Sequence, residues 1–392
     1  MKHLSFYFLF FLITTASFGQ FSISEKAEIS IITVGPGSEL FDKFGHTAIR
    51  VKDENFDKAY NYGVYDFDAP GFYTNFAKGK LLYILDVWPY DGFLNLYKKQ
   101  NRWVKEQILD LSYEQKQQFF FFLQNNALPE NRGYLYDFCY DNCATRPRDV
   151  VQKILKNQLT YDDSHLEDQL TFRQLIQKNV AANSWGSLGM DVAIGAVVDR
   201  KASPWEHQFI PEYFSNAIAH TSFTNRNGSS TPLVKETRMA FENDPQNESS
   251  RFITSPLFVF GIIGIIILLC TYKDIKKRHR SRYLDAGIFA ITGFIGIALA
   301  FLWWGTDHTA TVNNYNLLWA FPLSLVFVGL IAKKQPKRWM KNYVLFLLLC
   351  FALLILHWIT GVQRFAIGFI PLFIALFTRY IYVFSFLKKQ HQ

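Results

Sequence analysis

The feature that most constrains this chain is a series of apolar stretches that fills its C-terminal third. Each is close to the ~20 residues that a helix needs to cross a bilayer. They run from about Phe252 to Tyr272, Leu284 to Trp304, Asn316 to Ala332, Tyr343 to Gly361 and Phe365 to Phe386. The pattern predicts an all-α membrane domain of about five transmembrane helices over residues 252–386, followed by a short tail, 387–392.

The loops between these stretches predict their orientation. Positive charge gathers in "KDIKKRHRSR", "KKQPKRWMKN" and "LKKQHQ", while the alternate loops "GTDHTATVNNY" and "VQR" carry almost none. Basic loops face the cytoplasm, so the tail is expected there. They also account for the net charge of +8, which therefore gives no reason to expect a nucleic-acid partner. Arg379 lies near the cytoplasmic end of the last stretch, where its side chain is expected to snorkel.

The first residues, "MKHLSFYFLFFLITTASFGQ", have a lysine, an apolar core and then small residues. This is typical of a signal peptide over residues 1–19, and an uncleaved anchor helix is the alternative. Both interpretations place the next segment of the chain outside the cytoplasm. Residues 20–225 are expected to form an external domain, and the polar residues 226–251 a linker to the first span.

Within the external domain, β-prone segments are followed by helical ones. Four strands are expected in "EISIITVGPG", "HTAIRVKD", "AYNYGVYDFD" and "KLLYILDVWPY". Helices are expected in "SYEQKQQFFFFLQNNAL", with Ser112 as its cap, and in "NCATRPRDVVQKILKNQL". The predicted fold class is α+β, a small antiparallel sheet with helices packed on one side.

One cysteine stands where a reactive thiol is expected. Cys143 follows Asp141 and Asn142, two good helix caps, so it should lie at the start of a helix. Backbone N–H groups there stabilise a thiolate and lower its pKa. A histidine on a nearby strand, such as His46, supplies the base that a thiol nucleophile needs. Pro147 opposes this, because it falls in the first turns of that helix. A buried cysteine and a structural histidine remain the alternative.

Five motifs in order resemble one family of bacterial membrane enzymes. They are "PGSELFDKFGHTAIRV", "AYNYGVYDFD", "YDNCATRPRD", "WGSLGMDVAIGAVVD" and, in the membrane part, "DHTATVNNYNLLWAFPL". The family is the Lnb family of lipoprotein N-acyltransferases, and the resemblance covers nearly the whole mature chain. It implies a permuted papain-like (NlpC/P60-like) external domain, in which histidine precedes cysteine. It also implies a multi-pass protein of the bacterial inner membrane with that domain in the periplasm.

The resemblance carries catalytic roles to two residues. Cys143 matches the family's nucleophile, although Ala144 and Pro147 depart from the usual motif. His46 matches the histidine of the Phe-Gly-His-Thr motif and is expected to be the base. A third polar residue should orient its imidazole. The next strand offers Asn61, Tyr62 and Tyr65, of which we favour Asn61.

Substrate binding is predicted at two places. Near the catalytic pair are Asn142, Tyr62 and Arg146, whose guanidinium would hold a lipid phosphate or pair with Asp141 instead. In the loop after the second span are Asp307 and His308. That loop is either a polar, aromatic interfacial belt or a platform that meets the substrate below the cysteine.

Other candidates are weaker. Asp191 and Ser187 in "WGSLGMDVAIGAVVD" belong either to a packed helix or turn or to an acyl pocket. Cys139 and Cys143 are the only external cysteines, and four residues apart they would bridge only under strain. No zinc-like spacing occurs, so we predict no metal and no cofactor.

The function implied by the resemblance is acyl transfer through a cysteine thioester. The partners would be a phospholipid acyl donor, a diacylated lipoprotein whose α-amine is the acceptor, and the membrane. One competing hypothesis is a thiol amidohydrolase that cleaves cell-wall peptides and needs no membrane domain. The other is a membrane-anchored sensor or scaffold, in which the cysteine has no catalytic role.

Overall fold

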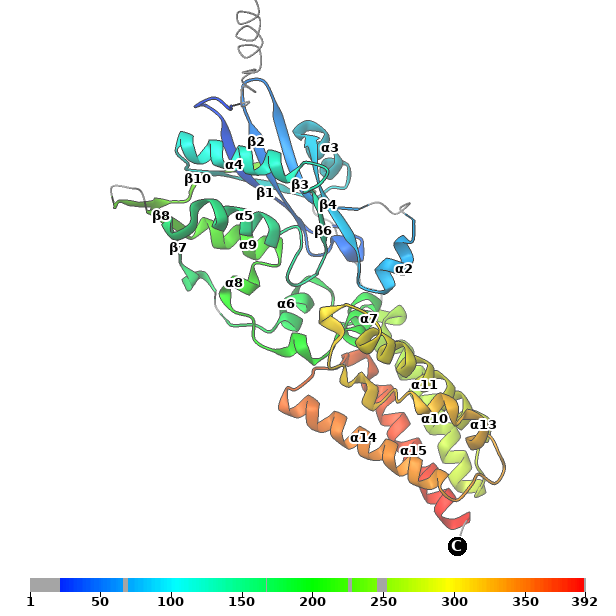
Figure 1. Cartoon of the computed structure of the whole chain (residues 1–392). Helices are drawn as coiled ribbons and strands as arrows, with labels where there is room; N and C mark the ends of the chain where they lie inside the picture. The colour runs from blue at the N-terminus through cyan, green and yellow to red at the C-terminus, as the bar shows by residue number, and fades with distance from the viewer. Residues whose placement is uncertain (1–21, 66–69, 167, 225–227, 245–251, 391–392) are drawn as a thin grey trace, which may run out of the picture.

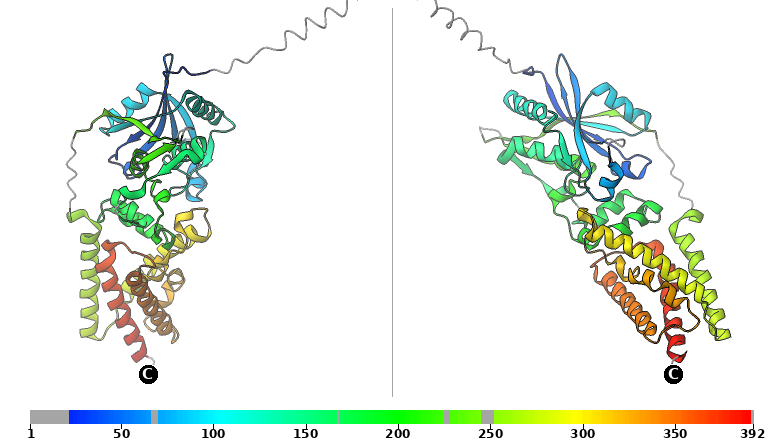
Figure 2. Two further views of the ribbon diagram at one scale, coloured as in Figure 1. Left: turned by 90° about the vertical axis from the view of Figure 1, so that its left-hand side faces the viewer. Right: turned by 45° about the vertical axis from the view of Figure 1, so that its right-hand side comes forward.

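The computed structural model describes residues 22–65, 70–166, 168–224, 228–244 and 252–390. The predicted signal peptide lies outside these residues. A domain of sheet and helices sits on one end of a helical bundle, and the C-terminus lies at the bundle's far end (Figure 1). Two further views show the same stacking, with α7 between the two parts (Figure 2).

Seven antiparallel strands form the main sheet of the described residues, in the order β10-β5-β1-β2-β3-β4-β6. They are β1 Glu28–Val34, β2 His46–Lys52, β3 Asp57–Val64, β4 Leu82–Pro89, β5 Val104–Leu109, β6 Gly133–Leu135 and β10 Val234–Phe241. The first four confirm the strands expected from the sequence.

Both faces of this sheet are covered, because its central strands are apolar on both sides. On β1, Ile29 and Ile31 pack with residues of α4, α5 and α9, whereas Ile32 and Val34 pack against α3. These helices are α3 Tyr90–Lys99, α4 Tyr113–Asn126, α5 Thr145–Leu155 and α9 Pro211–Ala219. The prediction of helices on one side was therefore wrong. The sequence analysis did not predict α3, although its buried residues Tyr90, Phe93 and Tyr97 recur at helical spacing.

Smaller elements complete the domain. The helices are α2 Phe72–Ala77, α6 Phe172–Asn179, α7 Trp185–Ala193 and α8 Pro204–His207, with 3-10 turns η1 Leu40–Asp42, η2 Lys156–Gln158, η3 Asp163–His165 and η4 Ala196–Asp199. A three-stranded sheet contains β7 Leu159–Tyr161, β8 Thr221–Thr224 and β9 Ser230–Pro232. The predicted cap of α4 is confirmed, since Ser112 accepts the N–H of Gln115 in a capping box.

The prediction of a linker over residues 226–251 is wrong for most of residues 230–241. Ser230–Pro232 forms β9, and Val234–Phe241 forms β10, which pairs with β5 at the edge of the main sheet. An edge strand exposes much of its surface, so its side chains are mostly polar and resemble those of a linker. Long-range pairing, which the local pattern does not show, makes this segment a strand.

Four helices of the described residues are long and apolar enough to span a membrane: Pro256–Lys277, Arg282–Trp304, Met340–Thr360 and Ile367–Gln390. They correspond to α10, α11, α14, and η8 Ile367–Phe369 with α15 Ile370–Gln390. The third apolar stretch differs from expectation, because it is broken into η7 Tyr315–Leu318, α12 Leu323–Val326 and α13 Val328–Ile331. Two further turns are η5 Phe252–Thr254 and η6 Thr309–Thr311.

The broken stretch nevertheless runs from one end of the bundle to the other. At one end Asn316 Nδ2 donates to the carbonyl of Asp191 in α7, and at the other Arg280 Nη2 donates to the carbonyl of Ile331. Pro322 lacks an N–H and interrupts the helix. A Cβ at Gly296 of α11 would lie 2.8 Å from Pro322 N, so glycine lets the two backbones touch.

Arg379 does not snorkel. Its side chain is fully buried inside the bundle and pairs with Asp274 of α10 at 2.8 Å and with Asp285 of α11 at 2.7 Å. A charge in a low-dielectric interior needs such partners, and these two lie on neighbouring helices far away in sequence. The expectation failed because the sequence pattern of α15 gives no information about which helix faces Arg379.

Backbone contacts fix the external domain to the bundle. Gly195 N donates to the carbonyl of Ala310 at 2.8 Å, and Ala196 N donates to the carbonyl of Asn313 at 2.9 Å. A Cβ at Gly195 would come within 1.9 Å of the carbonyl oxygen of Val312, so only glycine allows this approach. The loop after α11 is thus part of the interface between the two parts.

Candidate active site

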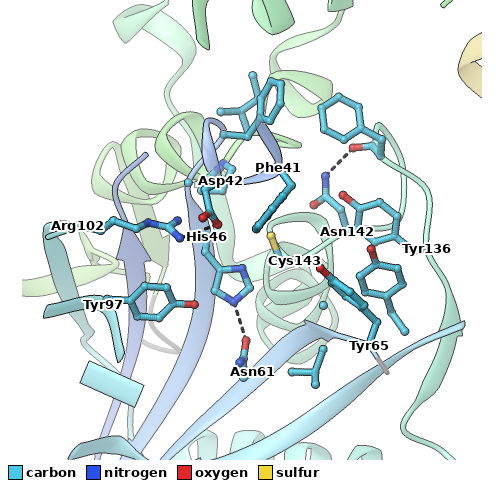
Figure 3. A pocket seen from close by; sticks show the side chains of 18 of the residues that line it. Phe41, Asp42, His46, Asn61, Tyr65, Tyr97, Arg102, Tyr136, Asn142 and Cys143 are labelled. Carbon is cyan, nitrogen blue, oxygen red and sulfur yellow. Dashed lines mark hydrogen bonds and ion pairs between the residues drawn. The ribbon is translucent and has the colours of Figure 1, made fainter. Parts of the chain in front are cut away.

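Cys143, His46 and Asn61 line one cavity of about 400 Å³ in the external domain. Figure 3 shows the cysteine sulfur beside the His46 ring, with Arg102 on the other side of the imidazole and Tyr136 on the other side of the cysteine. The cysteine lies in the turn just before α5, the histidine at the start of β2 and the asparagine in β3. The fold therefore brings together the three residues to which the sequence interpretation gave catalytic roles.

The segment before α5 is held by Asn142. This side chain is buried, and its Oδ1 accepts the N–H groups of Ala144 at 2.8 Å and Thr145 at 3.0 Å. Its Nδ2 donates to two main-chain carbonyls. Asn142 therefore fixes the backbone around Cys143, and its amide is not free for the substrate-binding role predicted for it. Pro147 is tolerated, because it occupies the third position of α5, where no N–H partner is lost.

A glycine in β3 lies against both Cys143 and His46. Gly63 has a φ of +93°, and the pairing of β3 with β4 shifts register between Asn61 and Val64. A Cβ at Gly63 would lie 3.4 Å from Cys143 Cβ and 3.7 Å from His46 Cε1. Both side chains therefore pack against the Gly63 backbone. A Cβ there would make ordinary contact with both side chains, but the positive φ would strain any residue other than glycine.

The imidazole of His46 is oriented by one hydrogen bond. Its Nε2 lies 2.6 Å from Asn61 Oδ1. An amide oxygen only accepts, so Nε2 carries the proton and Nδ1 is left as the acceptor on the ring. The ring also lies against Tyr97 of α3, with 6.1 Å between centroids. The bond and the aromatic wall hold His46 in the tautomer that a general base requires.

Burial sets the charge state of both His46 and Cys143. It lowers the pKa of His46 to about 4, against the raising effect of the Asn61 bond, and nearby Arg102 lowers it further. It raises the pKa of the Cys143 thiol to about 11, although the N–H groups of Thr47 and Cys143 and the charge of Arg102 lower it. The expected lowered thiol pKa is therefore wrong, because desolvation outweighs the helix start. The resting pair is a neutral thiol beside a neutral imidazole.

Arg102 is a charged residue of the cavity that sequence reasoning missed. It is 3 % exposed, its Nε donates to the carbonyl of Gly35, and its Nη1 pairs with Asp42 at 2.8 Å. Its Nη2 is buried without a hydrogen-bond partner among the described residues. Asp42 lies sixty positions earlier in the chain. No local pattern in the sequence indicates a contact over that separation, so nothing marked Arg102 as a residue of this site.

Two residues predicted to bind substrate lie outside the cavity. Tyr62 points to the opposite face of the sheet, where it is buried and its hydroxyl donates to Asn126 of α4 at 2.7 Å. Arg146 pairs with Asp141 and stacks over the ring of Tyr134, 4.2 Å from its centroid. The structure thus favours the ion pair, one of the two roles left open for Arg146, over a phosphate site.

Asp307 and His308 contact the external domain but do not reach the cysteine cavity. His308 Nε2 lies 3.0 Å from the carbonyl of Phe76 in α2, Asp307 N donates to the carbonyl of Lys78, and the Asp307 carboxylate pairs with Lys80 at 3.4 Å. Both residues line a second cavity. The loop that carries them is thus a contact between the two parts of the molecule.

The remaining candidates are structural in this arrangement. Asp191 is buried in an ion pair of 2.8 Å with Arg173, which also binds Asp199 at 2.9 Å. Ser187 is buried within α7. Cys139 is a free, buried thiol, and burial raises its pKa further than that of the nucleophile candidate.

Family models match both parts of the chain. The model described as the Lnb N-terminal periplasmic domain matches residues 16–178, and the Lnb transmembrane domain matches residues 246–391. The chain belongs to the Lnb family. This confirms the family that the five motifs indicated. No curated protein and no solved structure matches the chain significantly.

Family membership gives a location and a general role. The protein is an inner-membrane protein with a periplasmic N-terminal domain of α+β class and a helical membrane domain. Membership of this family also indicates that the protein is an enzyme that modifies lipoproteins.

Proposed function

We propose that the protein is a lipoprotein N-acyltransferase that moves an acyl chain from a phospholipid to the α-amine of a diacylglyceryl-cysteine. The observation that carries the proposal is the cavity in which Cys143, His46 and Asn61 meet, in a periplasmic domain held against a membrane bundle by backbone hydrogen bonds. A thiol nucleophile fixed at the membrane suits a lipid donor, because the acyl chain then need not cross water.

The first half-reaction forms a thioester. His46 Nδ1 takes the proton of the Cys143 thiol as the sulfur attacks the carbonyl carbon of a phospholipid ester. The C–O bond breaks, and the imidazolium returns the proton to the leaving glycerol oxygen, which releases a lysophospholipid. The N–H groups of Thr47 and Cys143 lie against the sulfur and are our candidate donors to the oxyanion.

The second half-reaction forms an amide. The free α-amine of the lipoprotein attacks the thioester, His46 accepts the proton that the nitrogen loses, and the C–S bond breaks. The sulfur leaves as a thiolate and regains its proton from the imidazolium. The pKa of about 4 at His46 keeps the imidazole neutral, and so basic, at the start of each half-reaction.

Two finer assignments belong to this proposal. A cysteine at a helix start and a histidine earlier in the chain on an antiparallel strand support the permuted papain-like fold. The basic loops 273–282 and 333–341 support five membrane passes and a cytoplasmic C-terminus, with the broken segment 315–331 as the third pass.

The test is mass spectrometry of lipoprotein N-termini in cells that lack their own N-acylating enzyme. These cells would produce the full-length parent protein, its Cys143→Ala variant or its Cys139→Ala variant. Cys139 is the matched control, because it is a free thiol four residues away, outside the cavity. We expect a third acyl chain with the parent and Cys139→Ala proteins, and none with Cys143→Ala.

A third chain formed by the Cys143→Ala protein would overturn the thioester mechanism. Absence of the third chain from a well-expressed parent protein would overturn the acyltransferase proposal itself. In that case hydrolysis of cell-wall peptides by the same thiol would be measured next.

A further inference from the structure

A second cavity of about 410 Å³ adjoins the cysteine cavity. The two share three lining residues, Tyr83, Tyr136 and Phe138. Tyr83 and Tyr136 stack with their ring centroids 4.3 Å apart. In Figure 3, Tyr136 lies on the side of Cys143 away from His46. The two cavities thus lie on either side of these aromatic side chains, and the second cavity is the neighbour of the sulfur on the side away from His46.

The walls of the second cavity come from both parts of the protein. Leu302 lies in the last turns of α11, and residues 307–311 come after it. Opposite them lie Leu81 before β4 and, from α6 and α7, Ile176 and Met190. The cavity therefore lies where the external domain meets the membrane bundle.

The lining is mostly apolar, and several of its polar groups already have partners. Thr311 Oγ1 donates to the carbonyl of Leu302, and Thr309 Oγ1 donates to Asp137 Oδ2. Asp307 pairs with Lys80. Among the described residues, no buried side-chain atom that lacks a partner belongs to this cavity. A charged or polar ligand would find nothing unmet to bind there, whereas an alkyl chain gains from burial.

The cysteine cavity differs from the second cavity in having a buried cationic group in its lining. Arg102, with a buried Nη2 that lacks a partner among the described residues, lines it on the far side of His46. A glycerophospholipid ester has the same asymmetry, since a hydrocarbon chain lies on one side of its carbonyl and a phosphate on the other. With the carbonyl at Cys143, the phosphate side faces the cation and the chain faces the apolar cavity.

We infer that the cavity between Leu81, Ile176, Met190, Leu302 and Ala310 binds the acyl chain of the donor phospholipid. This rests on the proposed function and adds to it the place where the chain is held. Phe76 of α2 lines the cavity and is also exposed at the surface. Two further exposed aromatic side chains belong to the same elements, Tyr73 to α2 and Trp304 to the end of α11, and such residues favour the headgroup level of a bilayer.

The cavity also limits the length of the acyl chain that it can hold. Its walls are joined by backbone hydrogen bonds, Asp307 N to the carbonyl of Lys78 and Gly195 N to the carbonyl of Ala310. Walls held in this way widen little, so the length of the transferred chain depends on the side chains that close the cavity. Filling it should therefore change which chain is transferred.

The first experiment measures that selectivity. Ala310→Phe and Ala193→Phe each fill the cavity from a different wall, and Ala352→Phe on the exposed face of α14 is the matched control. The readout is the length distribution of the third acyl chain by mass spectrometry. We expect the cavity variants to lower the ratio of the longest to shorter chains about tenfold, as a pocket that loses room for methylenes does. A distribution like that of Ala352→Phe in both variants overturns the inference.

The second experiment measures binding without turnover. The full-length Cys143→Ala protein in lipid nanodiscs is irradiated with phosphatidylethanolamine that carries a diazirine at the end of one acyl chain. We expect the label on residues 190–194 or 302–311. We expect several-fold less label there when the protein also carries Ala310→Phe. Label confined to lipid-facing residues such as Leu349 and Ile355 overturns the inference.

These arms separate the two proposals. If the parent protein makes no third chain but the cavity takes the label, the acyltransferase proposal fails and the chain-binding site stands. If the third chain forms while neither its length nor the label depends on the cavity, the site fails and the acyltransferase stands.

Discussion

Two buried polar clusters lie on one face of the same strand, and they differ in how their charged and titratable side chains are paired. Both belong to β2 and are covered by α3. Arg50 binds Asp57 through Nε at 2.8 Å and Glu106 through Nη1 at 3.0 Å, and its guanidinium lies 3.5 Å from the centroid of the Tyr90 ring. Four residues earlier, His46 has one hydrogen bond, to Asn61.

The difference shows which polar cluster can serve chemistry. The charge of Arg50 is compensated from two sides, and Arg50 lines neither the cysteine cavity nor the second cavity. The cluster around His46 opens into a cavity, and in it Arg102 Nη2 has no hydrogen-bond partner among the described residues. A buried polar cluster whose charges are paired favours one packing of the fold. A polar cluster that lines a cavity and has an unpaired group can bind a substrate.

The largest expected effect is on catalysis at His46. His46→Ala removes the base that must take the proton of a thiol whose pKa is about 11. We expect the rate of third-chain formation to fall by about 10²- to 10⁴-fold with little change in thermal stability. The measurement is a time course of lipoprotein acylation with purified protein in nanodiscs. A rate within a fewfold of the parent would remove His46 from the mechanism.

The second effect is on stability, at Arg50. Arg50→Met leaves the buried carboxylate of Glu106 and that of Asp57 without their cation. We expect a loss of about 3 kcal/mol, since breaking a buried pair is costly. This corresponds to an apparent melting temperature lower by about 10 °C for a domain of this size. Activity per folded molecule should be unchanged. A large loss of activity without loss of stability would contradict the contrast between the two clusters.

A third effect separates orientation from chemistry. Asn61→Ala removes one hydrogen bond from the imidazole, and we expect about a tenfold lower kcat, in line with the energy of one such bond. KM should change little, because Asn61 bonds to His46 and not to the leaving group. Asn61→Gln, which retains an amide, should restore part of the rate. Equal losses in both variants would point to damaged packing instead.

The pH profile tests the charge state of His46. Its pKa is lowered to about 4, so the base is neutral and active above that pH and becomes protonated as the pH falls through it. We expect kcat/KM to decline on the acid side near pH 4. In Asn61→Asp the new carboxylate favours the imidazolium, so the acid limb should move to higher pH. A limb that stays in place would mean that it reflects another group.

The smallest expected effect concerns Arg102. Its charge lowers the pKa of the Cys143 thiol, so Arg102→Gln should raise that pKa and slow alkylation by iodoacetamide at pH 8 by a fewfold. Asp42 loses its partner in that variant, so Arg102→Gln with Asp42→Asn is the control for charge imbalance. Unchanged alkylation in both proteins would show that Arg102 does not act on the thiol.

Much of the architecture could be predicted from local sequence patterns. The apolar stretches indicated the membrane domain, because a bilayer requires long uncharged segments whatever they pack against. The strands β1 to β4 and the capped helix α4 were indicated by side-chain alternation and by the Ser112 capping box. The motifs around His46 and Cys143 indicated the family. Each of these signals lies within a few residues of chain.

The tertiary structure decided the rest, because it depends on contacts between distant segments. Pairing with β5 makes Val234–Phe241 a strand, and partners on two other helices bury Arg379 instead of leaving it at the membrane surface. Burial, not position at a helix start, sets the charge of Cys143. The sequence by itself thus determined which residues are the candidates for reaction. Only the packing determined their protonation, the place of Arg102 beside them and the cavity between the two parts of the protein.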